Sequence, residues 1–396
     1  MSSNKTATCY YNEQHVQVSW DNVRDDFDEF MLSFDEYKLS GTFYMWFLPA
    51  LVLLGTIGNF LSLLVVSKDK FIRQHSASVY IAVMAVMDTL VLYVSAFRLW
   101  VGKITGEDLK MKSDLLCSII GGFLYHFTRH FAVWCVVAIT MERLLLVIFP
   151  TKCSAKNGKK RAIITIAVLG VCLAIFDSST LFTYTIVEEC FKFNSDSDKL
   201  QLHYRCFTDE ARKIWPWMDM VAYAFLPLSL LVPMNIVLVV NLAQLDKRRQ
   251  QNFSSSLTRQ TSRNSLNTDS GEQRERQKRR DARGYFTMIP IIVSIAYILL
   301  VFPMTVIEVV YADITNVDKH SVAKIRLARS ICFMLMYTNH SINFILYVAT
   351  GRTFRLKLID IFGFNCRKVT VSQLSSDEMG TFRESPPKNH NSGMVP

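Results

Sequence analysis

Apolar residues gather in seven runs along this chain, and stretches rich in charged residues separate the runs. A helix on the surface of a soluble protein has one apolar stripe, whereas a run that is apolar on all sides needs lipid or a large core around it. Each run has about 20–30 residues, which at 1.5 Å per residue is enough to cross a hydrocarbon layer of about 30 Å. Because backbone groups in lipid must be hydrogen-bonded within their own segment, each run is predicted to be a helix. The predicted spans are Phe43–Ser67, Ala77–Trp100, Asp114–Val147, Arg161–Ile186, Trp215–Leu245, Arg283–Tyr311 and Ile325–Ala349.

The predicted fold class is all-α, a seven-transmembrane helix bundle with a short amphipathic eighth helix. The clustering of the apolar residues excludes a soluble enzyme, a secreted disulfide scaffold and a nucleic-acid binder, in spite of a net charge of +10. Ser254–Arg280 has almost nothing to bury and is predicted to be largely disordered. The predicted regions are 1–42 as the extracellular N-terminus, 43–349 as the transmembrane domain with 246–282 as its third intracellular loop, 351–364 as the amphipathic helix and 365–396 as the cytoplasmic tail.

The distribution of Lys and Arg predicts the side of the membrane on which each loop lies. Loops and tail on one side carry 26 of these residues and those on the other side carry 13, and eight Asp and Glu precede Phe43. We therefore expect a multi-pass protein of the plasma membrane with its N-terminus outside and its C-terminus inside. No cleavable signal peptide is expected, because Met1–Ser40 is polar throughout. Asn4 begins a glycosylation sequon on the predicted outer side.

Polar side chains inside the predicted spans are costly in lipid and mark candidate functional positions. Asn59, Asp88 and Asn343 lie near the middle of the first, second and seventh spans. One interpretation is that they join helices by hydrogen bonds. The other, which we favour together with the motifs below, is a shared polar centre that binds a cation or rearranges when the bundle changes conformation.

The predicted inner ends of the spans carry a second group of candidate residues. Glu142 and Arg143 close the third span, where they either anchor the helix end at the interface or form a latch in which the carboxylate holds the guanidinium. Pro227, Pro290 and Pro303 interrupt the fifth and sixth spans and permit kinks. After the seventh span, an amphipathic stretch is expected to lie on the inner leaflet, and Cys366 follows it as a candidate palmitoylation site.

These features occur in the order typical of one family, and over Phe43–Phe364 the chain resembles the rhodopsin-like (class A) G-protein-coupled receptors. The matching motifs are Gly58-Asn59, Met87-Asp88, Cys117, Glu142-Arg143-Leu144 in place of Asp-Arg-Tyr, Pro227, Pro303, and Asn343-Phe344-Ile345-Leu346-Tyr347 in place of Asn-Pro-x-x-Tyr. Ser341-Ile342-Asn343-Phe344 and Gly351-Arg352-Thr353-Phe354-Arg355 are most similar to invertebrate neuropeptide receptors, including FMRFamide-type receptors.

The resemblance implies a receptor that is not an enzyme and that signals through a heterotrimeric G protein, with arrestin and receptor kinases as further partners. Its switch residues would be Glu142, Arg143, Pro303, Asn343 and Tyr347. A ligand that binds the open inner conformation better would shift the population towards it. No cofactor is expected except a sodium ion at the polar centre, and even this ion is in doubt because Ala132 stands where a serine is common.

The resemblance also implies a disulfide between the third span and the second outer loop. Cys117–Cys206 is favoured over Cys117–Cys190, since Cys206 is nearer the fifth span, and Cys9–Cys190 is then a candidate second bridge. Cys117 precedes Arg143 by one residue more than the family pattern leads us to expect, which predicts a bulge in the third helix. The cysteines show no metal-binding spacing.

Charged and aromatic residues in the outer halves of the spans suggest where a ligand binds. Either the charges form internal pairs, such as Arg129 with Glu308 or Asp219, or they form a pocket for a charged ligand. The seventh span has no Lys to bind retinal. In the third span, Leu124, Tyr125 and His126 occupy the region where amine receptors have an Asp, so a peptide is favoured. The predicted ligand-binding residues are Arg98, Tyr125, His126, Arg129, Asp219, Glu308, Tyr311 and Phe333.

The charge of the ligand stays open at this stage. Glu308 and Asp219 suit a basic peptide residue, and Trp100, Tyr311 and Phe333 suit an aromatic one beside it. The alternative is a chemosensory receptor whose small acidic ligand binds Arg98 and Arg129. A transporter is a remote third possibility, because the chain lacks the internal repeats common among transporters.

Overall fold

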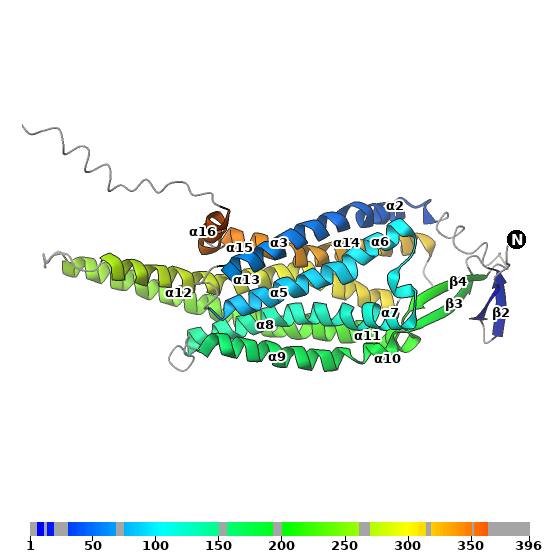
Figure 1. Cartoon of the computed structure of the whole chain (residues 1–396), viewed down its shortest axis with the longest axis horizontal. Coiled ribbons are helices and arrows are strands. Elements are labelled where there is room, and N and C mark those ends of the chain that lie inside the picture. The colour runs from blue at the N-terminus through cyan, green and yellow to red at the C-terminus, as the bar shows by residue number, and fades with distance from the viewer. Residues whose placement is uncertain are drawn as a thin grey trace, which may run out of the picture.

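The computed structural model describes residues 6–11, 14–19, 31–68, 75–149, 157–192, 200–260, 270–313, 318–350 and 352–362. Its main body is an elongated bundle of helices that run side by side (Figure 1). Six stretches are each long and apolar enough to cross a membrane as single helices, and a bent helix pair completes a seventh span. The predicted fold class is thereby confirmed.

The helices have the following bounds in chain order. The first span consists of α2 (Asp35–Thr42), η2 (Phe43–Phe47) and α3 (Leu48–Lys68), and the second of α5 (Ala77–Val91), η3 (Leu92–Phe97) and α6 (Arg98–Thr105). The short 3₁₀ helix η4 (Leu109–Met111) precedes the third span. The third span consists of α7 (Asp114–Leu116), η5 (Cys117–Leu124) and α8 (Tyr125–Ile148). The fourth span is α9 (Gly158–Asp177) followed by α10 (Thr180–Thr183), and the fifth consists of α11 (Asp209–Asp219), η7 (Met220–Phe225) and α12 (Leu226–Gln260). The sixth span lies in α13 (Ser270–Asp313), and the seventh consists of α14 (Lys319–Ser341) and α15 (Asn343–Thr350). The eighth helix is α16 (Arg352–Ile361), inside the range predicted for it.

Four of the described spans contain a π-helical segment, namely η2, η3, η5 and η7. A π-helical turn holds an extra residue without ending the helix, and such turns are rare and often lie at functional sites. In the third span this segment begins at Cys117. The one-residue excess between Cys117 and Arg143 is accommodated there, so the predicted bulge is confirmed.

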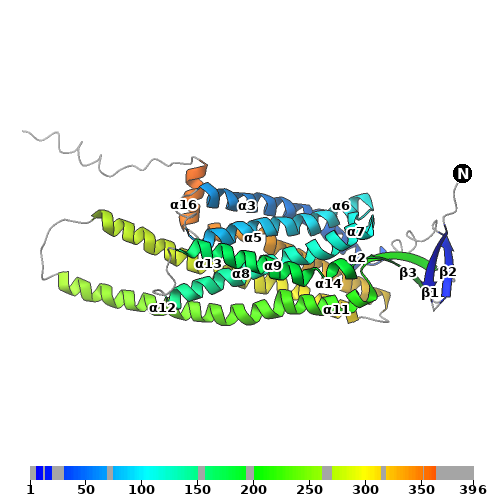
Figure 2. The same cartoon turned by 60° about the horizontal axis from the view of Figure 1, so that its bottom comes forward.

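Two antiparallel hairpins extend beyond one end of the bundle (Figures 1 and 2). Strands β3 (Ile186–Lys192) and β4 (Leu200–Cys206) lie in the second outer loop and pair with Ile186 opposite Cys206. Strands β1 (Thr6–Tyr11) and β2 (Gln14–Ser19) form a hairpin that was not predicted. Because β1 lies against β3, the N-terminal segment is close to the second outer loop.

The fourth span ends at Thr183, three residues before the predicted Ile186. Its helix is interrupted after Asp177, where the Ser178, Ser179 and Thr180 hydroxyls bond carbonyls three residues back, and after α10 the chain turns towards β3. The predicted disorder of Ser254–Arg280 is wrong in large part, because α12 continues to Gln260 and α13 begins at Ser270. Extending an existing helix is much cheaper than starting a new one, so the helices of spans five and six continue beyond their apolar segments.

The seventh span bends by 53° between α14 and α15, although its motif has Phe344 instead of proline. Ser341 at the bend uses its hydroxyl to bond the carbonyl of Tyr337 at 2.8 Å, a contact that competes with the helix backbone. Gly58 lies opposite Phe344, where an added Cβ would be 3.0 Å from that residue's Cβ. The first and seventh spans are therefore in close contact at the bend.

Candidate functional site

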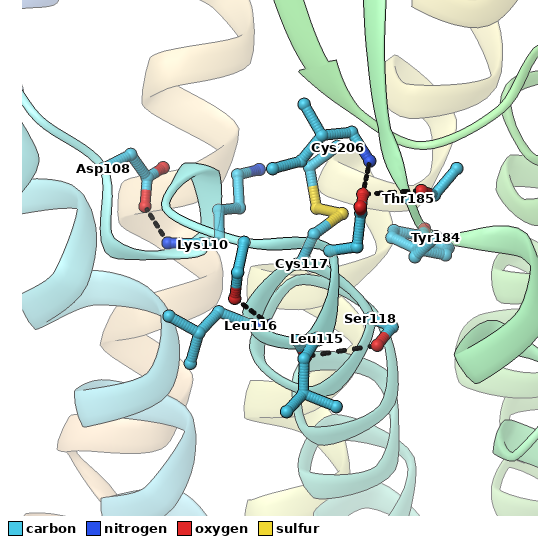
Figure 3. Close-up of a disulfide and its surroundings, with 12 residues drawn as sticks. Asp108, Lys110, Leu115, Leu116, Cys117, Ser118, Tyr184, Thr185 and Cys206 are labelled. Carbon is cyan, nitrogen blue, oxygen red and sulfur yellow. Dashed lines mark hydrogen bonds between the residues drawn. A yellow bond between two sulfur atoms is a disulfide. The ribbon is translucent and has the colours of Figure 1, made fainter.

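The second outer loop is attached to the third span by a disulfide and by hydrogen bonds (Figure 3). Cys117 and Cys206 are bonded, with their Cα atoms 5.5 Å apart, so the favoured pairing is confirmed. Asp114 accepts hydrogen bonds from the Thr185 hydroxyl at 2.7 Å and the Ile186 amide at 2.8 Å. The hairpin is thus held over the outer end of the bundle. The side chains of Cys9 and Cys190, and residues Asn4 and Cys366, lie outside the described part of the chain.

The largest group of buried charges lies between the third, fourth and fifth spans, and we refer to it as the Asp219 cluster. It consists of Asp219 with Arg129, His126, His130 and Asp177. One oxygen of Asp219 accepts from Arg129 Nη2 at 2.9 Å, and the other lies 3.0 Å from His126 Nδ1 and 3.1 Å from His130 Nε2. Because these residues come from three helices, the cluster joins the outer halves of those spans.

His130 lies between two carboxylates in this cluster. Its Nδ1 is 2.8 Å from Asp177, on the side opposite Asp219. Its Nε2 lies 3.1 Å from an Asp219 oxygen but makes no hydrogen bond to it among the described residues. His126, His130 and Asp219 also have ligand atoms within 4.8 Å of one another, a spacing that suits a metal ion. The Arg129 guanidinium on the same carboxylate opposes a divalent ion there.

Arg129 is enclosed by the protein. Only 1% of its surface is exposed, and its guanidinium lies 4.6 Å from the Tyr125 ring and 4.3 Å from the Tyr223 ring. This arrangement corresponds to the internal-pair interpretation of Arg129, with Asp219 and not Glu308 as the partner. His126 is likewise engaged on its second nitrogen, which lies 2.9 Å from the Tyr184 hydroxyl.

A second ion pair joins the sixth and seventh spans. Arg329 donates two hydrogen bonds to the Glu308 carboxylate, at 2.5 and 3.1 Å. The guanidinium also lies over the rings of Tyr311 and Phe333, at 4.5 and 5.2 Å. Both charged side chains are partly accessible, at 32% for Arg329 and 25% for Glu308. The sequence analysis missed Arg329, although its position inside a predicted span was a signal for it.

A third pair lies at the outer end of the second span, where Arg98 bonds Asp108. Arg98 also donates to the carbonyl of Val94 at 3.0 Å. Lys110 follows nearby in the loop that covers the disulfide (Figure 3). Burial and the neighbouring Arg98 charge lower the pKa of the Lys110 ammonium to about 8. Asp108 lies in a loop, and nothing in the sequence identified it as a partner of Arg98.

The residues of the predicted polar centre come together deeper in the bundle. Asp88 accepts from Asn343 Nδ2 at 2.7 Å on one oxygen and from His340 Nδ1 at 2.8 Å on the other. Asn59 donates to the backbone carbonyl of His340 at 3.4 Å. The sequence analysis did not include His340, even though it is a polar residue inside the seventh span.

A series of contacts links this polar centre to the Asp219 cluster. Tyr223 has its ring against Arg129 and its hydroxyl 3.3 Å from His340 Nε2. His340 in turn contacts Asp88, and Asp88 contacts Asn343. A change at the outer cluster therefore has a direct physical route to the motif of the seventh span.

At the inner end, Arg143 donates to the Ser76 hydroxyl at 3.4 Å. Both carboxylate oxygens of Glu142 lack a hydrogen-bond partner among the described residues. The predicted hydrogen-bonded latch between these two neighbours is thus not formed in this conformation. Tyr347 is buried and packs on Phe354, which anchors α16 against the end of the seventh span.

The chain was compared with known proteins. The sequence model of the family described as "7 transmembrane receptor (rhodopsin family)" matches residues 58–347, which is well over half of the chain. No curated protein sequence matches it. The matched range runs from Gly58 to Tyr347, the first and last of the motif residues, and it contains the Arg98–Asp108, Arg129–Asp219 and Arg329–Glu308 pairs.

Proposed function

Because this chain belongs to the rhodopsin family of seven-transmembrane receptors, we propose that it is a plasma-membrane receptor for an extracellular peptide. The ligand class we propose is a neuropeptide, of the kind bound by FMRFamide-type receptors. Receptor kinases and arrestin would act on the Ser and Thr residues of the cytoplasmic segments.

The observation that carries the peptide proposal is the Glu308–Arg329 pair. Of the Arg98–Asp108, Arg129–Asp219 and Arg329–Glu308 pairs, it is the one in which both charged side chains are at least a quarter exposed. A basic side chain of a peptide can therefore compete with Arg329 for Glu308. Tyr311, which is 40% exposed, offers an adjacent surface for an aromatic side chain.

The alternative of a small acidic ligand has weaker support. The two arginines on which it depends are Arg98 and Arg129, and each is already paired with a carboxylate. To reach Arg129, an acidic ligand would have to displace Asp219 from a site that is almost closed to solvent. Breaking a buried pair of this kind costs about 3–5 kcal/mol. Asp219 and His126 accordingly hold the helices in place in our proposal and do not contact the ligand.

The activation step follows from the connected contacts. Binding at Glu308 releases Arg329 and shifts the sixth span relative to the seventh, with Pro303 as the flexible point of α13. The ligand stabilises the conformation to which it binds better, in proportion to that difference in affinity. The inner ends of the helices then separate, and Arg143 becomes available to a G protein.

The test is a G-protein activation assay in transfected cells that express the full-length receptor and a promiscuous Gα subunit. A library of amidated peptides, some containing Arg beside an aromatic residue, is applied to wild type. We expect a saturable response, and we expect Glu308→Gln to raise the half-maximal concentration at least about tenfold, the loss of one charged hydrogen bond.

The matched control is Glu107→Gln, which removes an exposed outer carboxylate paired with Lys112. This control should respond as wild type does, and surface expression is measured for each variant. A library that yields no response from well-expressed receptor, together with a response to small carboxylates that Arg98→Gln abolishes, would replace the peptide proposal with the acidic-ligand alternative.

A further inference from the structure

The family resemblance implies a sodium ion beside Asp88, and the side chains around this carboxylate do not fit one. A hard cation such as sodium is bound by oxygen atoms of carboxylates, carbonyls, hydroxyls and water. Here the groups that face the two Asp88 oxygens are N–H donors, from His340 and Asn343. Ala132 supplies no hydroxyl from the third span. A cation would have to displace one of the two donors to reach the carboxylate.

His340 is held firmly in this position. It is 1% exposed, and each of its polar groups is in contact with a different helix. Nδ1 donates to Asp88 of the second span, Nε2 faces the Tyr223 hydroxyl of the fifth, and the backbone carbonyl accepts from Asn59 of the first. Moving the imidazole aside would break its contacts with Asp88 and Tyr223 inside the bundle, where a polar group left without a partner costs about 1–3 kcal/mol.

We propose that the imidazole of His340 takes the place of a cation at Asp88, so that the polar centre of this receptor forms without sodium. The N–H of His340 supplies the positive end that a bound ion would otherwise supply. The link between the Asp219 cluster and Asn343 is then made of side chains alone. Its formation does not depend on the sodium concentration of the medium.

The experiment is a thermal-unfolding measurement on purified full-length receptor, in sodium chloride and in choline chloride at equal ionic strength. For wild type we expect midpoints that agree within ~1 °C. His340→Ser removes the imidazole and places a hydroxyl oxygen near Asp88. This variant should gain a sodium-specific rise of roughly 2–5 °C, because an ion that binds only the folded state stabilises it.

Two matched variants complete the test. His340→Gln keeps an N–H donor of similar reach and should remain insensitive to sodium. The double variant His340→Ser with Asp88→Asn lacks the carboxylate and should lose the rise seen in His340→Ser.

A sodium-specific rise in wild type overturns the proposal, and so does a folded His340→Ser receptor that shows no such rise. If His340→Ser cannot be purified, His340→Asn provides a carbonyl oxygen for the same comparison. If neither variant folds, the wild-type measurement decides by itself. None of these outcomes depends on knowing the peptide ligand, so they are independent of the proposed function.

Discussion

Asp219 is the carboxylate that three buried side chains in the outer half of the bundle share. Its carboxylate faces Arg129, His126 and His130 at 2.9–3.1 Å and is nearly buried. We predict that Asp219→Asn lowers the free energy of unfolding by about 3–5 kcal/mol, because it leaves the buried Arg129 guanidinium without its charged partner. Adding Arg129→Gln should recover part of this loss. Thermal unfolding of the two single variants and the double variant measures the coupling, and fully additive effects would contradict the ion pair.

Lys110 has a pKa that makes stability depend on pH. Its pKa is about 8 in the folded protein and its ordinary value is 10.5, so the unfolded chain binds more protons between these two pH values. The free energy of unfolding therefore rises as pH increases through that window. Keeping Lys110 charged costs the folded state roughly 1–3 kcal/mol at neutral pH. Lys110→Met should raise the unfolding midpoint at pH 7, and the gain should shrink above pH 9.

The control for Lys110 is Lys103→Met, which removes an exposed lysine from the end of α6. Its effect on the midpoint should be small and nearly independent of pH. A gain from Lys110→Met that does not change with pH would show that lost packing, and not charge burial, causes the difference.

At the scale of elements, the disulfide holds the β3–β4 hairpin to the third span. Cys206 ends β4, and its sulfur approaches Gly121 so closely that an added Cβ would lie 2.7 Å from it. We predict that Cys117→Ser with Cys206→Ser lowers the free energy of unfolding by about 2–4 kcal/mol, since the bridge closes a long loop. The decisive measurement is thermal unfolding. Cys332→Ser, at a free cysteine, is the control, and equal losses from both would contradict this role.

At the scale of the whole molecule, the two ends of the bundle differ in kind. The hairpins lie at one end, and α16 and the extended part of α12 lie at the other (Figure 1). The Lys and Arg count predicts that the second end lies in the cytoplasm. We predict that an N-terminal epitope is stained on intact cells and a C-terminal epitope only after permeabilisation. The reverse pattern would contradict the orientation, whichever ligand the receptor binds.

The sequence predicted which helices form, but it predicted their ends less accurately. The spans, the π-helical bulge of the third span and the Cys117–Cys206 pairing were all predicted correctly. The interruption of the fourth span after Asp177 was not predicted, because hydroxyl groups that bond nearby carbonyls leave no trace in hydrophobicity. The helical extensions of α12 and α13 were missed because composition ignores the helix already formed upstream.

The candidate site was predicted in part. Asp219 and Glu308 were predicted as candidate partners of Arg129, but Arg329 and His340 were not predicted as partners. Which arginine each of the two carboxylates pairs with depends on how the helices pack, so the Glu308–Arg329 pair could not be predicted from the sequence. His340 was not predicted because it belongs to no family motif.

The sequence by itself determined how many times this chain crosses the membrane and which residues carry charge within the spans. These properties depend on the length and polarity of segments that are continuous along the chain. The tertiary structure decided which charges meet. His340 and Asp88 are 252 residues apart in sequence, and Arg129 and Asp219 are 90 apart. Such contacts depend on how each helix is rotated and shifted against its neighbours, which is a property of the packed bundle and of no single segment.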